Sequence, residues 1–400
     1  MHRVQVENSC GSRPLETTAS ERWPYFDNDE IAAVTAVLRS GKVNQWTGDR
    51  VKQFEEEYQR RIGGFAIALA NGSLALELAL RAFGIGEGDE VIVTPRSFIA
   101  SASCVRLVGA TPVFADVDLS SGNMTAQSIA AKITARTKAV IPVHLAGWPA
   151  DMADIMAVAE AHGLRVIEDC AQAHGAVIDG EPVGSFGDAA AFSFCQDKII
   201  TTGGEGGLVV FKDLDAYEWA WSFKDHGKSL RKIRSPAPEP GFRWLHDRVG
   251  TNWRMLEISA AIGLLQLEKL EEWRRRRAEN AGIWSAALRE VEGVRTPHPR
   301  QGHTHAYYKF YAYLSGDNSE LRRRRILDQG LSLGIRIFTG SCSEVYREHA
   351  FADLEVKPLP NACELGASSL MFEVHPTLDQ DRLRSRAAAI AELIARTAKG

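Results

Sequence analysis

Between residues 65 and 211 the chain alternates short, continuously apolar runs with helical patterns, and this alternation limits the possible folds more than any other feature. The apolar runs predict strands at 65–70, 90–94, 112–117, 139–144 and 164–168. The patterns between them predict helices at 73–83, 99–108 and 152–162. Strands that are apolar throughout are typical of a parallel sheet that is buried on both faces. We therefore expect an α/β protein with a largely parallel sheet between layers of helices.

The pattern changes in the second half of the chain. Two more strands are predicted at 189–194 and 207–211, close enough in sequence to be neighbours in the sheet. The later elements are a Pro- and Gly-containing loop at 231–242, a long helix at 257–277, a strand at 306–314, and a helix at 319–330 followed by the segment 334–338. We expect a flexible N-terminal extension (1–22), a large domain (23–280) and a small C-terminal α+β domain (281–400).

Charge and cysteine content exclude several classes of protein. The formal net charge is −4, so no overall field favours nucleic acid or an anionic membrane as a partner. Six cysteines without a CxxC pair argue against a zinc site and a disulfide framework, so we expect no metal and reduced thiols. The N-terminus lacks the apolar core of a signal peptide, and no apolar stretch reaches the ~18 residues that span a bilayer. We therefore expect a cytoplasmic protein with neither nucleic acid nor a membrane as a partner.

Lys198 and Asp169 carry the strongest chemical signal. Lys198 lies between the predicted strand 189–194 and the glycine-rich stretch 203–207, and an amine held there can form a Schiff base with an aldehyde cofactor. Upstream, the apolar run 164–168 ends at Asp169, a carboxylate that would keep a pyridine nitrogen protonated. An amine and an acid so placed match the chemistry of pyridoxal 5′-phosphate (PLP). Alone, Lys198 also fits a solvated surface lysine, and Asp169 a helix cap.

The other parts of PLP have candidate partners too. Its phosphate needs free N–H groups at a helix start, where Gly72 allows close approach and the Ser73 hydroxyl can cap the helix and touch an oxyanion. Ser193 is a second phosphate candidate. Phe98 follows a strand at the end where α/β sheets hold ligands and would cover the ring, while Gln172 would reach the phenolic oxygen or pack beside the ring. The plainer alternatives are a helix cap, a buried strand serine and a core phenylalanine.

Eight short motifs occur in a distinctive order between residues 46 and 254. They are Trp46-Thr-Gly48, Asn71-Gly-Ser73, Gly86-Glu-Gly-Asp-Glu-Val91, Glu168-Asp-Cys-Ala-Gln172, His174-Gly-Ala176, Phe192-Ser-Phe194 before Lys198, Gly204-Glu-Gly-Gly207 and Gly250-Thr-Asn-Trp-Arg254. By this order and spacing the chain resembles the DegT/DnrJ/StrS sugar aminotransferases, and the resemblance runs from about residue 23 to the end of the chain. That family has the fold of the fold-type I PLP enzymes. The resemblance implies a mostly parallel seven-stranded sheet in a large PLP-binding domain, followed by a small C-terminal domain.

The resemblance also assigns roles to the residues that match the motifs. Lys198 would be the Schiff-base lysine, Asp169 the partner of the pyridinium nitrogen and Gln172 a ring contact. Phe98 matches the stacking position, and the phosphate contacts match Gly72, Ser73 and Ser193. Asn252 matches an asparagine that enters the neighbouring subunit's site, which implies a homodimer with shared active sites.

The activity implied is transfer of an amino group from glutamate, or less often glutamine, to a keto group of a nucleotide-linked sugar. Its product would be an amino sugar for a surface polysaccharide or a glycosylated metabolite. The alternatives are an aminotransferase for cyclitol ketones, a PLP-dependent sugar dehydratase and a non-catalytic regulator of the same fold. The presence of Lys198 and Asp169 counts against the last two. A nicotinamide dehydrogenase is disfavoured because no GxGxxG lies between a strand and a helix.

The chain departs from the commonest family pattern at three places. Arg96 and Ser97 stand where a small residue and a threonine are frequent. Cys195-Gln-Asp197 replaces the usual spacer before the lysine, and the stretch 339–351 differs from the commonest substrate loop. These departures leave open which sugar and nucleotide are used, whether C3 or C4 is aminated, and whether the assembly exceeds a dimer.

Overall fold

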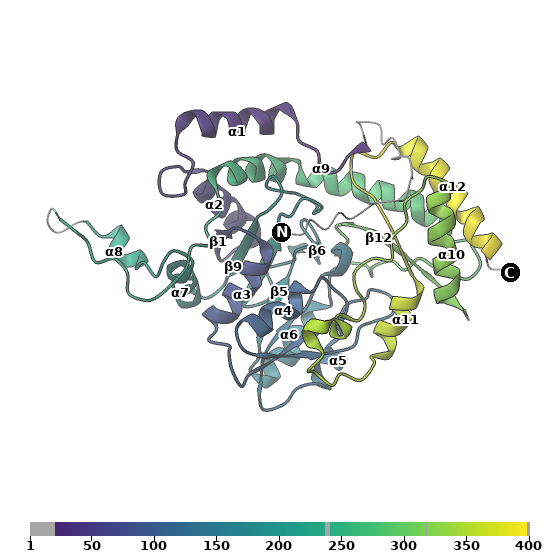
Figure 1. Ribbon diagram of the computed structural model, residues 1–400, viewed down its shortest axis with the longest axis horizontal. Helices are drawn as coiled ribbons and strands as arrows, with labels where there is room; N and C mark the ends of the chain where they lie inside the picture. The colour runs from purple at the N-terminus through teal and green to yellow at the C-terminus, as the bar shows by residue number, and fades with distance from the viewer. Residues whose placement is uncertain (1–20, 237–240, 317, 398–400) are drawn as a thin grey trace, which may run out of the picture.

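The computed structural model describes residues 21–236, 241–316 and 318–397 and has a seven-stranded sheet at its centre (Figure 1). The strand order is β1-β9-β8-β5-β4-β2-β3. The strands are β1 (Phe65–Leu69), β2 (Glu90–Val93), β3 (Thr111–Phe114), β4 (Thr137–Ile141), β5 (Arg165–Asp169), β8 (Ala189–Ser193) and β9 (Gly207–Phe211). Neighbouring strands are parallel, except that β9 runs antiparallel to both β1 and β8. The predicted mostly parallel seven-stranded sheet, with the strands 189–194 and 207–211 as neighbours, is confirmed.

Helices cover the sheet, which explains its continuous apolar strands. β2 and β9 are buried at every residue. The covering helices include α2 (Arg50–Ile62), α3 (Gly72–Ala82), α4 (Ala100–Leu107), α6 (Met152–His162) and α7 (Leu214–Lys224), and the short α5 (Ala126–Ala130) packs against α6. A side chain pointing to either face of such a strand therefore meets a helix rather than water, so apolar residues are favoured at consecutive positions.

One long helix joins the two halves of the chain. α9 (Glu257–Leu288) has 32 residues and runs along the top of Figure 1 beneath α1 (Asn28–Ser40). The prediction that it ends at residue 277 is wrong, because Trp284 and Leu288 continue its buried face into a second hydrophobic cluster. The arginine run 274–277 lies in the middle of the helix.

The second hydrophobic cluster lies in the C-terminal part. A three-stranded sheet, β10-β12-β13, packs there with helices. The elements are β10 (Val294–Arg295), β12 (Phe310–Leu314), α10 (Ser319–Ser332), α11 (Pro360–Ser368), β13 (Ser369–Phe372) and α12 (Gln380–Thr397). A further small sheet, β11-β6-β7, consists of β6 (Val177–Ile178), β7 (Glu181–Pro182) and β11 (His303–Thr304).

Other predicted elements in the second half of the chain also differ from the structure. The loop predicted at 231–242 contains a short helix, α8 (Leu230–Arg234), which Ser229 caps. The strand predicted at 306–314 begins only at Phe310, because Tyr307 has a left-handed backbone with φ of 49°. In the segment 334–338 only Phe338 forms a bridge, to Met371.

The N-terminal extension predicted at 1–22 lies mostly outside the described residues. Its last two residues are described, and Glu21 there is buried and pairs with Arg386 at 2.9 Å.

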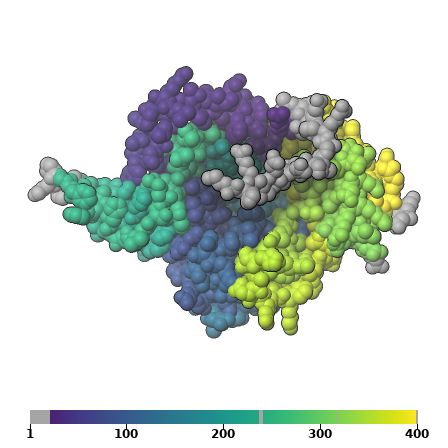
Figure 2. Space-filling view, in the orientation of Figure 1, coloured from purple at the N-terminus to yellow at the C-terminus, as the bar shows by residue number. Residues whose placement is uncertain are grey.

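At the opposite side of the molecule the segment 225–236 and its return, 241–250, extend away from the sheet as an arm that carries α8 (Figures 1 and 2).

Candidate active site

The candidate site lies at the carboxyl ends of the parallel strands. β5 ends at Asp169, and its parallel neighbour β8 ends at Ser193, with Asp169 opposite Ala191 in the register. The loop after β8 carries Lys198, and the loop after β2 carries Phe98. Because the carboxyl ends of parallel strands meet at one edge of a sheet, the topology brings these residues together.

Lys198 is held among groups that come from distant parts of the chain. Its side chain is 15% exposed, and its Nζ lies 3.4 Å from Asp197 Oδ1. The same Nζ lies over the ring of Tyr308, 5.0 Å from its centroid. The Tyr308 hydroxyl donates a hydrogen bond to Asp197. The indole N–H of Trp23 donates to the backbone oxygen of Lys198 at 3.0 Å, so both backbone and side chain of the lysine are positioned.

Asp169 is a buried carboxylate with few protein donors. It accepts hydrogen bonds from Ser101 Oγ at 2.6 Å and from the backbone N–H of Ala171 at 3.1 Å. Burial raises the pKa of Asp169, and the hydrogen bonds and the charge of Lys198 only partly oppose that effect. A cation against this carboxylate would favour its ionised form, which is what a protonated pyridine nitrogen provides.

The predicted phosphate residues converge at the start of α3. A Cβ added at Gly72 would lie 2.6 Å from the Cβ of Ser193, so glycine is required for this close approach. Ser73 is exposed in the first turn. The expectation that Ser73 caps the helix is wrong: α3 begins at Gly72, and Asn71 caps it by accepting from Leu74 N at 3.0 Å. The Ser73 hydroxyl is therefore not used as the cap.

Phe98 and Gln172 occupy contrasting positions. Phe98 is 66% exposed, so the alternative of a core phenylalanine is wrong and its ring is accessible to a ligand. Gln172 is buried, and its Oε1 accepts from the backbone N–H of Ala146 at 2.7 Å. Within the described chain its amide nitrogen makes no hydrogen bond, which leaves donors for a ligand.

Asn252 lies apart from these residues. It is exposed in the segment 250–256, where its backbone pairs with that of Asp225. Arg254 holds this segment in place, through an ion pair with Asp225 at 2.8 Å and a backbone bridge to Leu69. The contacts of Asn252 within the described chain involve none of the other predicted site residues.

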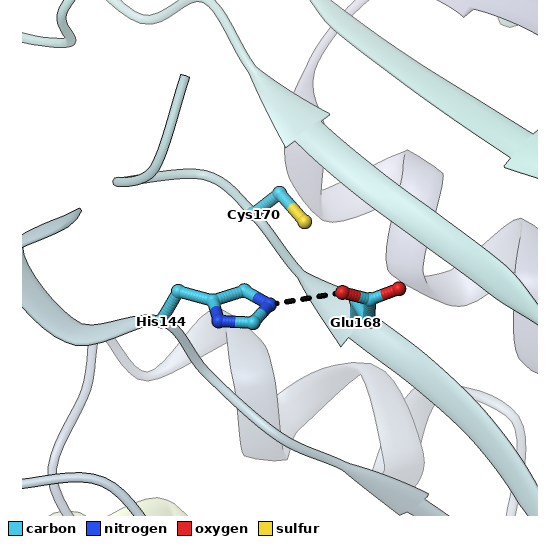
Figure 3. A group of neighbouring side chains, drawn as sticks. All are labelled: His144, Glu168 and Cys170. Atoms are coloured by element: carbon cyan, nitrogen blue, oxygen red, sulfur yellow. Dashed lines mark hydrogen bonds and ion pairs between the residues drawn. The ribbon is translucent and has the colours of Figure 1, made fainter. Parts of the chain in front are cut away.

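A buried group of three side chains beside the site has the composition of a metal site, but two of the three are engaged in hydrogen bonds within the protein. His144, Glu168 and Cys170 have donor atoms within 4.8 Å of one another (Figure 3). Both oxygens of Glu168 accept backbone N–H groups of the loop 184–187, at 2.7–2.8 Å, and His144 Nε2 donates to one of them at 3.1 Å. His144 Nδ1 accepts from the backbone N–H of Ala150. Burial raises the pKa of the Cys170 thiol, so it stays protonated. The hydrogen bonds of His144 and Glu168 join the segment after β4 to β5 and to the loop 184–187.

Three residues that support the site were not predicted from the sequence. Ser101 bonds Asp169, Tyr308 contacts the Lys198 loop, and His174 Nε2 donates to the backbone oxygen of Ser193 at 2.8 Å. His174 has a sequence signal, since it stands in one of the motifs quoted above. Ser101 and Tyr308 have none, because their roles depend on contacts between distant segments.

Comparison with known proteins identifies the family. Residues 24–391 match the DegT/DnrJ/EryC1/StrS aminotransferase family. The chain belongs to this family. Its members are PLP-dependent sugar aminotransferases, and the predicted family, fold-type I architecture and enzyme class are confirmed.

Similar proteins differ in their substrates. The X-ray structure of an aminotransferase from Psychrobacter cryohalolentis is 49% identical, with a TM-score of 0.91, and the match covers 94% of this chain and 99% of that one. A UDP-N-acetyl-3-dehydro-α-D-glucosamine 3-aminotransferase from Acidithiobacillus ferrooxidans is 37% identical over 84% of each chain. A 3-amino-5-hydroxybenzoate synthase from Amycolatopsis mediterranei is 34% identical over 83% of this chain and 84% of that one. Overall identity therefore does not select the acceptor of this aminotransferase.

None of the helices in the described part of the aminotransferase combines the length and apolar character that crossing a bilayer requires.

Proposed function

We propose that this aminotransferase binds PLP and moves an amino group from glutamate to a keto group of a nucleotide-linked sugar. The observation that carries the proposal is the placement of a buried acid, Asp169, at the end of one strand and of an amine, Lys198, in the loop after the adjacent parallel strand. These are the two protein groups that PLP chemistry requires.

The residues present fit PLP in three respects. The Asp169 carboxylate is buried and its pKa is raised by burial, so a pyridinium would complete its environment. The start of α3 offers N–H groups beside Ser193, with Gly72 leaving room that a Cβ would fill. Phe98 exposes its ring at the same edge of the sheet. We assign the phosphate to Gly72, Ser73 and Ser193, and the ring to Phe98 and Gln172.

The residues around the proposed cofactor would have different roles in the reaction. When bound, PLP supplies an aldehyde that exchanges amines and a ring that withdraws electrons. Lys198 would hold the cofactor through its amine and, once released by the donor substrate, would move the proton between carbon atoms as a general base and acid. Asp169 would keep the ring nitrogen protonated by placing a negative charge against it. Tyr308 and Asp197 would orient the released amine.

Nucleotide-linked ketosugars are the proposed acceptors, because a relative of 37% identity is named for such a substrate. A carbocyclic ketone is the second candidate, because a relative of 34% identity is named for an aminated ring that is not a sugar. A panel of 3-keto and 4-keto sugars linked to UDP, dTDP and GDP, supplied with glutamate, would separate the two. Amination of one panel member, located by NMR, is the expected result; no amination of any member, together with amination of a cyclitol ketone, would support the second candidate.

We further propose a homodimer in which Asn252 reaches the partner's site. Asn252 is exposed and not engaged with its own site, and the nearby arm exposes three large apolar side chains: Phe242 (78%), Trp244 (82%) and Val249 (92%). Apolar surface of this kind marks an interaction site. The five described cysteines are free thiols, as expected for the reducing cytoplasm that we propose as the location.

Peptide mapping tests the central assignment. Borohydride should fix PLP to the amine that carries it, and we expect the label on Lys198. Lys309 is the matched control, because its Nζ lies over the same Tyr308 ring at 5.2 Å. Lys309→Ala should leave the label in place, whereas Lys198→Ala should abolish it. Label on any other lysine of the wild-type enzyme would refute the assignment.

A further inference from the structure

Two of the departures from the family pattern lie against each other in the structure. The loop 339–348 pairs with the segment after β2: Ser97 N donates to the backbone oxygen of Cys342 at 3.1 Å, and Val345 N donates to that of Pro95 at 2.9 Å. Between these two bonds, Arg96 donates through Nη1 to the hydroxyl of Ser343. We call this set of contacts the clasp.

Arg96 is an unusual residue for such a position. It is fully buried, and its guanidinium lies over the rings of Tyr311 and Tyr313, at 5.3 and 5.9 Å from their centroids. Within residues 21–236, 241–316 and 318–397, no carboxylate lies within 4.0 Å of it, and Nε and Nη2 have no hydrogen-bond partner. Burying a cation without a counter-ion is costly, and aromatic faces offset only part of the cost. The buried charge of Arg96 is therefore better explained by the loop 339–348 that it holds in place than by a contribution to the stability of the fold.

The loop 339–348 is connected to both walls of the candidate site. On one side, Ser97 precedes Phe98, and its hydroxyl lies 2.9 Å from that of Ser101, the donor to Asp169. On the other side, Ser341 N donates to the hydroxyl of Tyr311 at 2.8 Å. Tyr311 lies three residues after Tyr308, whose hydroxyl contacts Asp197 in the Lys198 loop.

The same loop borders open space. It lines a cavity of about 1050 Å³, whose other walls include residues of α10 and α11. A volume of this size has room for a substrate larger than glutamate. The loop is thus bonded on one side to the segments that carry Phe98 and Tyr308, and on another side it lines this cavity.

We propose that Arg96 is a positioning residue that holds the loop 339–348 in the shape that recognises the acceptor, and so helps to set which acceptor is used. The recognition of an acceptor rests on the proposed function, whereas the clasp itself does not. Glutamate and the acceptor react in separate half-reactions with the same catalytic groups. A loop that recognises only the acceptor therefore affects the half-reaction of the acceptor and not that of glutamate.

The clasp is tested by hydrogen–deuterium exchange in the purified holoenzyme. Arg96→Met removes the charge and keeps apolar bulk. We expect amides of 339–348 to exchange about tenfold faster, the factor that corresponds to loss of ~1.4 kcal/mol. Ser343→Ala removes the same bond from the other partner and should act in the same direction, which also covers the case in which Arg96→Met does not fold. Arg295→Met is the control, because Arg295 also lies over Tyr313, at 5.2 Å, but bonds the backbone of Leu119.

The acceptor role is tested with the panel of keto sugar nucleotides described above. For the member that the wild-type enzyme aminates, we expect Arg96→Met and Ser343→Ala to raise KM roughly tenfold. The half-reaction with glutamate, followed by the absorbance of the bound cofactor, should stay within about twofold of wild type.

Three outcomes would overturn the proposal. Unchanged exchange of 339–348 in both variants would show that Arg96 does not hold the loop. Equal losses in the glutamate and acceptor half-reactions would show that the loop does not serve the acceptor. If the wild type converts glutamate but no panel member, the acceptor part is wrong together with the proposed acceptor, while the exchange experiment still decides the clasp.

Discussion

Replacing Ser101 with alanine should reveal how strongly Asp169 depends on a single hydroxyl. Ser101 Oγ donates to Asp169 Oδ2 at 2.6 Å, and the backbone N–H of Ala171 donates to Oδ1 at 3.1 Å. Both side chains are buried, at 2% and 4% exposure, so water cannot readily replace the lost donor. The variant therefore leaves one carboxylate oxygen without its donor, and it also removes the contact between the Ser101 and Ser97 hydroxyls.

The expected loss follows from the charge on the acceptor. A hydrogen bond to a charged group contributes about 1.5–3 kcal/mol, which corresponds to a factor of roughly 10 to 150. Because the bond favours the ionised form, its loss should raise further a pKa that burial already raises. We expect Ser101→Ala to weaken PLP binding and slow the glutamate half-reaction, each by roughly tenfold or more. Asp169→Asn should keep much of the bound cofactor but lose more activity, because it removes the charge itself.

Titration of the cofactor-free protein with PLP, followed by absorbance, measures the first quantity, and a single-turnover reaction with glutamate measures the second. Ser103→Ala is a matched control: Ser103 lies in the same helix, α4, and its hydroxyl makes no hydrogen bond within the described chain. Activity and affinity of Ser101→Ala within twofold of wild type would refute the reasoning. So would an equal loss in the Ser103→Ala control.

Four further predictions follow from individual contacts. Burial lowers the pKa of His174 to about 4. The folded state therefore binds fewer protons than the unfolded state between pH ~6.5 and pH ~4. The contribution of His174 is fully present above that range, and its loss should lower the free energy of unfolding by up to roughly 3 kcal/mol as the pH falls across it. Because burial also lowers the pKa of His305 and of His375, each to about 3, denaturation of His174→Gln should show a smaller fall than the wild type, and an identical pH dependence would contradict the prediction. Gly72→Ala should weaken PLP binding in the same titration, because its Cβ would lie 2.6 Å from Ser193 Cβ. Gly282→Ala, inside α9 with no atom within 4 Å of the new Cβ, should instead stabilise the protein by about 0.5–1 kcal/mol in a denaturant titration. Trp244→Asp should shift the light-scattering mass from dimer towards monomer, and an unchanged mass would argue against the arm as the interface.

The central sheet could be predicted because its strands carry a local signal. The run at 90–94 has an apolar centre at 91–93, the run at 207–211 is apolar after its glycine, and the structure buries both as β2 and β9. The helix end at 277 could not be predicted this way, because its continuation depends on the second hydrophobic cluster. α1 was missed although it has a local signal, a capping box of Asp27 and Glu30.

A site residue could be predicted when its role depends on its neighbours in the sequence, and not when its role depends on backbone geometry or on contacts with distant segments. The family motifs singled out Lys198 and Asp169, and the strand order then placed both at one edge of the sheet. The cap of α3 was misassigned by two residues, to Ser73 instead of Asn71, since both are good capping residues and only the backbone geometry distinguishes them.

The sequence alone determined which segments form the strands of the sheet, and it determined that an amine and an acid follow two of them. It could do so because apolar strand patterns and motifs each consist of neighbouring residues. Only the tertiary structure decided what surrounds those groups. Tyr308 meets Asp197 across 111 residues of chain, and Arg96 meets Ser343 across 247. Such contacts arise when the C-terminal segments pack onto the end of the sheet, and no local pattern encodes how two distant surfaces fit together.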